Sequence, residues 1–278
     1  MCKIIILGGD LRFEALAQSL KDRYSVYFYS NEKDISVPLI GGCDYLVLPL
    51  PCTSGDSTIL NFPPHIELRD IFPLLNKKTC VLAGKVSDSL YALARQVGID
   101  IYDYYTDEFE TLNAIPSAEG AIEIAMNMTD FTLCGSKCFV LGYGRIGKIL
   151  SKMLSGIGAE VTVCARRKES LALAKALGNN IINLYDLFPS AGEADIIFNT
   201  IPSLVLDRST LLKLKKDVLI IDLASKPGGV DFECCKELDI NAVHALGLPA
   251  KSAPETSCRI LVNSICSFIE ERRTNGTS

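Results

Sequence analysis

The chain has 278 residues, of which 48% are hydrophobic and 22% are charged, and its formal net charge is -5. Because domains usually contain about 100–200 residues, this length predicts two domains, each large enough to bury its own core. The negative charge excludes the basic footprint of a nucleic-acid-binding protein. The opening apolar run from Ile4 to Leu7 is too short for a signal sequence or a membrane span, so we expect a cytoplasmic protein with no membrane partner.

The first part of the chain, residues 1–113, alternates short apolar runs with helix-like stretches. Continuous apolar strands separated by helices predict an α/β domain built on a doubly wound parallel sheet. The expected strands are Lys3 to Leu7, Val26 to Tyr29, Tyr45 to Leu48, Cys80 to Ala83 and Ile99 to Tyr102. We expect this domain to contribute to substrate binding and catalysis.

A connecting helix is expected at residues 114–134, between the two domains. Ser117 is a typical helix start signal, and helix-like residues follow it as far as Met128. The helix is the expected hinge. Glu119, in its first turn, is a candidate general base or water-positioning residue, although a plain carboxylate favoured by the helix dipole explains it equally well.

A second alternation of strands and helices fills residues 135–250. It predicts a second doubly wound, Rossmann-like parallel sheet of six strands. These strands are expected to begin at Lys137 and to continue at Glu160 to Ala165, Asn180 to Asn183, Asp195 to Asn199, Val218 to Asp222 and Ile240 to His244. Residues 251–278 contain a further helix, which we expect to return to the first domain.

A glycine-rich turn, GYGRIG at residues 142–147, lies between the strand Cys138 to Leu141 and a helix. In this context the spacing G-x-G-x-x-G is typical of a dinucleotide-binding turn. Gly142 allows the tight turn, Gly144 lets the backbone approach a pyrophosphate, and Gly147 permits close packing of helix on strand. The second domain is therefore predicted to bind a dinucleotide.

The residues around this turn indicate which dinucleotide is bound. Arg145 and Ile146 open the helix, whose free N–H groups are suited to the pyrophosphate. A NAD-binding domain usually presents an acid about 20 residues further on, whereas the second strand here ends Ala165-Arg166-Arg167. Because arginine offers forked donors and a permanent charge, we predict that Arg166 and Arg167 hold the 2′-phosphate of NADP. Two solvated loop arginines are the alternative.

Polar residues also follow the expected fourth and fifth strands of the second domain. Ligands lie at the carboxyl ends of the strands in such sheets. We therefore expect Thr200, Pro202 and Asp222 to face the nicotinamide half of the cofactor.

Four segments resemble the family of dipicolinate synthase A subunits, and the resemblance runs the length of the chain. They are Ala118 to Ile122, Leu141 to Arg145, Asn199 to Pro202 and Asp222 to Phe232. The last segment is the most specific, because ordinary dehydrogenases lack its Ser-Lys-Pro-Gly-Gly run. The sequence departs from the family pattern at residues 245–250 and 256–258, and it matches the pattern only loosely at residues 8–12.

The resemblance implies oxidation of dihydrodipicolinate, formed from 4-hydroxy-tetrahydrodipicolinate of lysine biosynthesis, to pyridine-2,6-dicarboxylate (dipicolinate), with NADP as acceptor. It also implies that the partner is a flavoprotein-like B subunit and that the location is the mother cell of a sporulating bacterium. The sequence leaves open whether the chain also forms a homo-oligomer.

A flat dianionic substrate needs cationic or N–H donors for its carboxylates, and a base for the proton lost as hydride leaves. Lys226 is the first choice of carboxylate anchor and is also a catalytic candidate, with a solvated lysine as the alternative. The adjacent Gly228 and Gly229 are candidate backbone donors. Four polar residues are secondary candidates, with ordinary turn residues as the alternative: Arg12, Thr53, Ser54 and Ser225.

Two other functions remain open. A 2-hydroxyacid dehydrogenase has the same organisation, but it uses an arginine near the place of Lys226 and a histidine as acid–base. Only His65 and His244 are present, and we interpret His244 as a hydrogen-bonded strand-end residue. The other alternative is a non-catalytic NADP-binding subunit whose partner does the chemistry.

Eleven cysteines are scattered from Cys2 to Cys266 without a CxxC pair. Many lie inside apolar runs, so we interpret most of them as small buried hydrophobic residues in a reducing compartment. With two histidines in the chain, the ligand spacing predicts no metal site.

Overall fold

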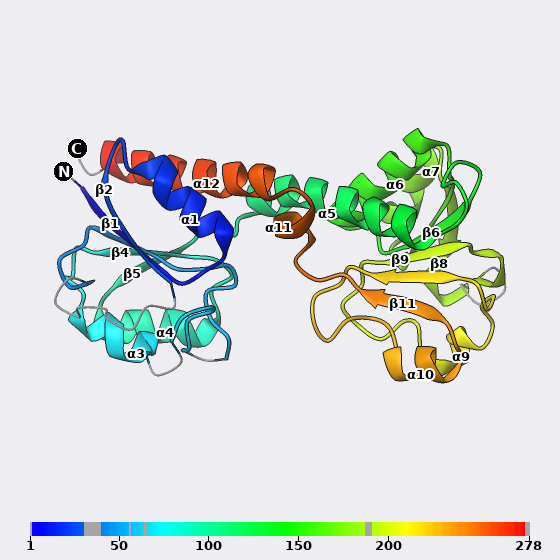
Figure 1. Cartoon of the computed structure of the whole chain (residues 1–278), viewed down its shortest axis with the longest axis horizontal. Coiled ribbons are helices and arrows are strands. Elements are labelled where there is room, and N and C mark those ends of the chain that lie inside the picture. The colour runs from blue at the N-terminus through cyan, green and yellow to red at the C-terminus, as the bar shows by residue number, and fades with distance from the viewer. Residues whose placement is uncertain (1, 31–39, 56, 64–65, 187–190, 276–278) are drawn as a thin grey trace. The chain divides into compact units, whose positions relative to one another are not determined.

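The computed structural model describes residues 2–30, 40–55, 57–63, 66–186 and 191–275 (Figure 1). The chain divides into two compact units, which we call unit 1 and unit 2. Unit 1 comprises Met1–Glu110 and Pro254–Ser278, and unit 2 comprises Thr111–Ala253. The helix α12 (Pro254–Asn275) therefore returns to the first unit, as the sequence analysis expected.

Unit 1 contains a five-stranded parallel sheet with the strand order β2-β1-β3-β4-β5. Its short strands are apolar and almost wholly buried at the centre, because both faces of the sheet are covered. The strands are β1 (Lys3–Leu7), β2 (Ser25–Tyr29), β3 (Tyr45–Val47), β4 (Cys80–Ala83) and β5 (Asp100–Asp103). The order reverses between β1 and β3, and in doubly wound sheets ligands bind at such a switch point.

Helices cover both faces of this sheet (Figure 1). On one face α1 (Leu11–Leu20) packs against α12, which buries Leu261, Ile265 and Ile269 in a shared core with β1. The other face is covered by α3 (Leu68–Ile71) and α4 (Asp88–Val97), with the turn η1 (Phe72–Leu74) between them. The sheet thus has a hydrophobic core on each side.

Unit 2 contains a six-stranded parallel sheet with the order β11-β10-β9-β6-β7-β8. This order is that of a complete dinucleotide-binding sheet, with the switch point between β6 and β9. The strands are β6 (Lys137–Leu141), β7 (Glu160–Ala165), β8 (Asn180–Asn183), β9 (Ile196–Asn199), β10 (Leu219–Asp222) and β11 (Asn241–His244). The predicted fold class, two doubly wound α/β domains, is confirmed.

Helices and short turns connect the strands of unit 2. The helices α6 and α7 pack on one face of the sheet together with the unit 2 part of α5, while α9 and α10 lie on the other. The connecting elements among the described residues are α6 (Arg145–Ile157), α7 (Lys168–Ala176), η2 (Leu184–Asp186), η3 (Ala191–Glu193), α9 (Arg208–Leu211) and α10 (Phe232–Glu237). The short helix α11 (Leu248–Ser252) follows the last strand.

The helix α5 (Asp107–Met128) begins ten residues before the predicted start at Ser117. Its first turn is capped by Thr106, whose hydroxyl accepts a hydrogen bond from the N–H of Phe109 at 3.2 Å. The hydroxyl of Ser117 donates to the carbonyl of Asn113 at 2.9 Å, as serines do inside helices. The prediction of a serine start was wrong, because Pro116 is accommodated within the helix instead of ending it.

Candidate functional site

The three glycines of the nucleotide turn meet different surroundings. Gly142 has a φ of +92°, and a Cβ atom there would lie 2.4 Å from Oγ1 of Thr200. A Cβ atom on Gly147 would lie 2.2 Å from the carbonyl oxygen of Gly142, so the first turn of α6 packs directly on the end of β6. Gly144 has no atom within 4 Å of the place where its Cβ would be. The open side of the turn is therefore at Gly144, as the dinucleotide interpretation requires.

The first turn of α6 offers backbone donors beside this opening. Gly144 is the N-cap residue and supplies no side-chain hydrogen bond, so the opening N–H groups lack the usual cap. The side chain of Arg145 is exposed, whereas Ile146 packs against the core of unit 2. Of these two predicted cofactor contacts, Arg145 has an exposed side chain, whereas Ile146 has only its backbone on the open side of the turn.

A pocket of about 470 Å³ adjoins the turn. Nine residues line it: Gly142, Tyr143, Gly144, Ala165, Arg166, Arg167, Ser170, Tyr185 and Ile201. The strand β7 ends at the buried Ala165, and the two arginines that follow it are exposed and precede α7. The place where a NAD-binding domain usually has a carboxylate is thus occupied by guanidinium groups.

Five of the nine lining residues were not among the predicted cofactor contacts, and two of them, Ser170 and Tyr185, lie outside the motifs that the sequence singled out. Ser170 lies in the first turn of α7, and Tyr185 follows β8, the strand beside β7 in the sheet. The side chain of Tyr185 is 73% exposed, and its N–H donates to Oδ1 of Asn183 at 3.1 Å. The carboxyl end of β8 could have pointed to Tyr185, because neighbouring parallel strands end at the same edge.

Thr200 ties the nucleotide turn to the neighbouring strand. Its hydroxyl and its N–H both donate to the carbonyl of Leu141, at 2.8 and 2.9 Å, where β6 ends. This residue therefore holds the turn in place with its hydroxyl already engaged. Pro202 is exposed two residues further along, so it remains a candidate for contact with the cofactor.

Asp222, at the end of β10, is completely buried. Its Oδ1 accepts hydrogen bonds from Nδ2 of Asn199 at 2.8 Å and from the N–H of Ala224 at 3.1 Å. Its Oδ2 accepts from the N–H of Gly229 at 2.8 Å. The carboxylate therefore holds the following loop through these buried hydrogen bonds. It has no exposed surface with which to contact a cofactor.

This loop, residues 223–231, presents Ser225 and Lys226 to solvent. The N–H of Gly228 donates to the carbonyl of Ser225 at 2.9 Å, and the N–H of Gly229 is held by Asp222. The suggestion that the two glycines offer free backbone donors was wrong. Gly229 is glycine because a Cβ would lie 2.4 Å from Nδ2 of Asn199.

The candidate acid–base residues lie in different environments. The ring of His244 stacks on Phe232, and its Nε2 lies 2.9 Å from the carbonyl oxygen of Ala224, so the ring is a hydrogen-bonded strand-end group. Glu119 is exposed on α5 and is far from the helix start, so the helix dipole no longer explains it. His65 lies outside the described residues.

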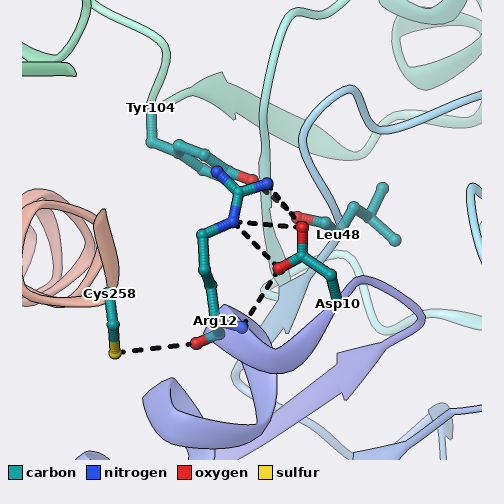
Figure 2. Close-up of polar contacts among 5 residues, drawn as sticks. All are labelled: Asp10, Arg12, Leu48, Tyr104 and Cys258. Atoms are coloured by element: carbon teal, nitrogen blue, oxygen red, sulfur yellow. Dashed lines mark hydrogen bonds and ion pairs between the residues drawn. The ribbon is translucent and has the colours of Figure 1, made fainter. Parts of the chain in front are cut away.

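In unit 1, Asp10 and Arg12 form an ion pair where β1 leads into α1 (Figure 2). Asp10 is the N-cap of α1 and accepts a hydrogen bond from the N–H of Arg12 at 3.0 Å. The side chain of Arg12 is only 11% exposed. The predicted substrate residue Arg12 is therefore a fixed, largely buried cation at the carboxyl edge of the sheet.

The other two predicted substrate residues of unit 1 lie in the loop after β3. Thr53 forms an isolated antiparallel bridge with Ile59, and the N–H of Ser54 donates to the carbonyl of Thr58 at 2.9 Å. Thr53 is half-buried and Ser54 is exposed. Thr53 and Ser54 thus lie on backbone that is paired with residues 58 and 59.

The cysteines are free thiols, and eight of the eleven are buried, as predicted. Burial raises the pKa of Cys138 to about 11 and that of Cys164 to about 12, so these thiols are protonated and inert at neutral pH. Among the described residues, no group of three or more His, Cys, Asp and Glu side chains is arranged to hold a metal ion. No described helix is long and apolar enough to cross a membrane.

The fold and the nucleotide turn can be compared with known classes of protein. Residues 117–231 match the family model of the D-isomer specific 2-hydroxyacid dehydrogenase, NAD binding domain. In fold, the chain is similar to the apo-structure of D-lactate dehydrogenase from Escherichia coli, with a TM-score of 0.71 and 16% identity, covering 99% of this chain and 97% of that one. Residues 117–231 are therefore similar to a NAD(P)-binding domain of the dehydrogenase type.

The first unit is similar to the corresponding part of one group of proteins. Residues 3–105 match the model of the N-terminal domain of the dipicolinate synthase A subunit. The chain is 29% identical to the dipicolinate synthase A subunit of Bacillus subtilis, over 97% of this chain and 96% of the relative. The crystal structure of that protein from Bacillus subtilis superposes with a TM-score of 0.85 and 28% identity, covering 99% of this chain and 97% of that one. The expected resemblance is confirmed: the chain is a homologue of the dipicolinate synthase A subunits.

Proposed function

We propose that this chain is the NADP-dependent oxidoreductase subunit of a dipicolinate synthase, converting a dihydrodipicolinate-type intermediate to pyridine-2,6-dicarboxylate. The observation that carries the proposal is the pocket at the nucleotide turn, where Arg166 and Arg167 replace the usual acid. The likeness to dipicolinate synthase A subunits supports the substrate. A flavoprotein-like B subunit is the proposed partner, and the cytoplasm of the sporulating mother cell is the proposed location.

The residues of unit 2 fit a bound dinucleotide. The open side of Gly144 leaves room for the pyrophosphate beside the uncapped N–H groups of α6. The exposed guanidinium groups of Arg166 and Arg167 suit a 2′-phosphate, which accepts forked hydrogen bonds. When bound, NADP supplies the acceptor for the hydride.

The chain's own side chains would then bind the substrate and accept a proton. Oxidation of a dihydropyridine to a pyridine removes one hydride and one proton, so a base must take the proton. The exposed carboxylate of Glu119 is the proposed base of unit 2. Lys226 and Ser225, both exposed on the loop that Asp222 organises, are the proposed cation and donor for a substrate carboxylate.

A second candidate function is that of a 2-hydroxyacid dehydrogenase, which the match at residues 117–231 favours. Such an enzyme needs a histidine as acid–base in the cleft. The Nε2 of His244 is engaged by the carbonyl of Ala224, which disfavours it in that role. Reduction of 2-keto acids by the purified chain would support this alternative. Cofactor binding without turnover of any substrate would favour a non-catalytic NADP-binding subunit.

Replacing Arg166 and Arg167 together by alanine tests the cofactor assignment. We expect NADPH to bind about 100-fold more weakly, because two charge-assisted contacts to the 2′-phosphate are lost, while NADH affinity changes by less than about threefold. Fluorescence titration of the bound nicotinamide measures both. A matched control replaces the exposed Lys152 and Lys175 on α6 and α7, which lie outside the pocket lining. Equal losses for NADPH and NADH would contradict the 2′-phosphate assignment.

Replacing Lys226 by alanine tests the substrate assignment. With freshly generated dihydrodipicolinate and the B subunit present, we expect KM to rise about tenfold or more, because a charge-assisted contact to a carboxylate is lost. NADPH affinity should stay unchanged. Lys226→Arg keeps the charge and should recover most of the affinity. An unchanged KM in the alanine variant would mean that Lys226 is a solvated surface residue that does not bind the substrate.

A further inference from the structure

The ion pair of Asp10 and Arg12 leaves part of the guanidinium group available. The Nε of Arg12 lies 2.9 and 3.1 Å from the two oxygens of Asp10, and Nη2 lies 2.7 Å from Oδ2 (Figure 2). A guanidinium group can bind a carboxylate along two edges, one formed by Nε and Nη2 and the other by Nη1 and Nη2. Asp10 occupies the first edge and leaves the second.

The second edge of Arg12 reaches solvent. Among the described residues, Nη1 has no acceptor, yet it is not one of the buried atoms that lack a partner. Because a buried guanidinium N–H must find an acceptor or contact water, this nitrogen lies where a ligand can reach it. The side chain as a whole is only 11% exposed, so a ligand there would meet the charge in partly desolvated surroundings.

Hydrogen bonds hold both backbone polar groups of Arg12. Its N–H is held by Oδ1 of Asp10 at 3.0 Å, and its carbonyl accepts the thiol hydrogen of Cys258 at 3.8 Å. Tyr104, close to the guanidinium, is completely buried and donates its hydroxyl hydrogen to the carbonyl of Leu48 at 2.9 Å. Burial raises the pKa of Asp10, but the hydrogen bonds and charge of Arg12 outweigh it and leave that pKa below its ordinary value. Asp10 is therefore an anion at neutral pH.

We propose that Asp10 is a positioning residue, which holds Arg12 with its Nη1/Nη2 edge presented to a carboxylate of the substrate. The inference rests on the proposed function, in which the substrate is a pyridine-type dicarboxylate, and it takes up Arg12, which the sequence indicates as a substrate residue. A free arginine side chain loses rotamer entropy when a ligand immobilises it. With Asp10 bound to the first edge, that loss has already occurred before the carboxylate arrives, so the ligand binds more tightly.

The competing explanation is that Asp10 only caps α1. The variant Asp10→Asn separates the two roles, because asparagine caps helices as well as aspartate does but carries no charge to hold the guanidinium. The probe is pyridine-2,6-dicarboxylate, titrated calorimetrically into the full-length chain saturated with NADP. Four proteins are compared: wild type, Asp10→Asn, Arg12→Lys and the double variant.

If Asp10 acts through Arg12, Asp10→Asn weakens binding of the dicarboxylate about fivefold to tenfold, and Arg12→Lys weakens it more. The double variant then binds no more weakly than Arg12→Lys alone, because the effect of Asp10 requires the arginine fork. Asp207→Asn is the control: Asp207 caps α9 through the N–H of Thr210, and its neutralisation should leave binding unchanged.

Two results would overturn the inference while leaving the proposed function intact. One is wild-type affinity in Asp10→Asn. The other is an equal loss from Asp10→Asn in the wild-type and the Arg12→Lys backgrounds, which would mean that Asp10 acts independently of the arginine. A wild-type chain that binds NADP but no pyridine-2,6-dicarboxylate would instead contradict the proposed function, and this inference with it.

Discussion

Replacing Gly144 by valine is expected to weaken binding of both NADPH and NADH by more than about 100-fold, because the added methyl groups occupy the space of the pyrophosphate. The fold should survive. Gly144 has no protein atom within 4 Å of the place of its Cβ, and its backbone, with φ of -81°, is accessible to any residue. Calorimetric titration measures the affinities, and thermal denaturation checks the fold.

Two other glycines of α6 make this experiment specific. Gly156 also has open space around the place of its Cβ, so Gly156→Ala should leave both cofactor affinity and folding unimpaired. Gly147 is the opposite case, since a Cβ there would meet the carbonyl oxygen of Gly142 at 2.2 Å. Gly147→Ala should therefore lose stability as well as binding. If Gly144→Val binds NADPH as the wild type does, residues 142–147 are not the cofactor turn.

Replacing Asp222 by alanine is expected to lower the free energy of unfolding by about 3 kcal/mol or more, because buried donors cost about 1–3 kcal/mol each when left unpaired. The affected donors are Nδ2 of Asn199 and the N–H groups of Ala224 and Gly229. Urea denaturation measures the loss, and hydrogen exchange of the loop residues 223–231 shows whether the loop opens.

A second aspartate of unit 2 provides the comparison. Asp231 accepts one hydrogen bond, from the N–H of Cys234 at 3.0 Å, as the N-cap of α10. Loss of such a cap costs about 1 kcal/mol, so Asp231→Ala should be clearly milder. If the two variants lose the same stability, the hydrogen bonds of Asp222 are not what holds the loop that presents Ser225 and Lys226.

The sheets and the nucleotide turn could be predicted from the sequence because their signals are local. The run Cys138 to Leu141 is apolar and is followed at once by the glycines and a helix-like stretch, a context typical of a dinucleotide-binding turn. The place of Arg166 and Arg167 beside this turn was predictable for the same reason, since they directly follow the second strand, and their role toward a 2′-phosphate stays a prediction. Ser117 was misleading because helix-start rules consider only neighbouring residues, and these suggest that Pro116 ends a helix. The rules do not include the burial of Ala114 and Ala118, which lie on one continuous helix.

The roles of single polar residues depend on tertiary contacts, which local rules do not contain. The carboxyl end of a strand indicates a ligand edge, but it does not say whether a side chain there turns outward or inward. Asp222 turns inward and is fully buried, whereas Lys226, four residues on, is exposed. Likewise, the sequence indicates Arg12 as a cation but not the partner that fixes its orientation, Asp10.

The return of α12 to unit 1 affects the order in which the chain can mature during synthesis. Unit 2 is continuous in sequence, so all of it has been synthesised before the last helix is made. Unit 1 lacks one side of its hydrophobic core until Leu261, Ile265 and Ile269 arrive. Since domains generally fold as their sequence becomes complete, the amino-terminal unit is the later of the two to finish folding. A ribosome that stops near residue 253 therefore releases a cofactor-binding unit attached to an unfinished partner with an exposed apolar sheet face.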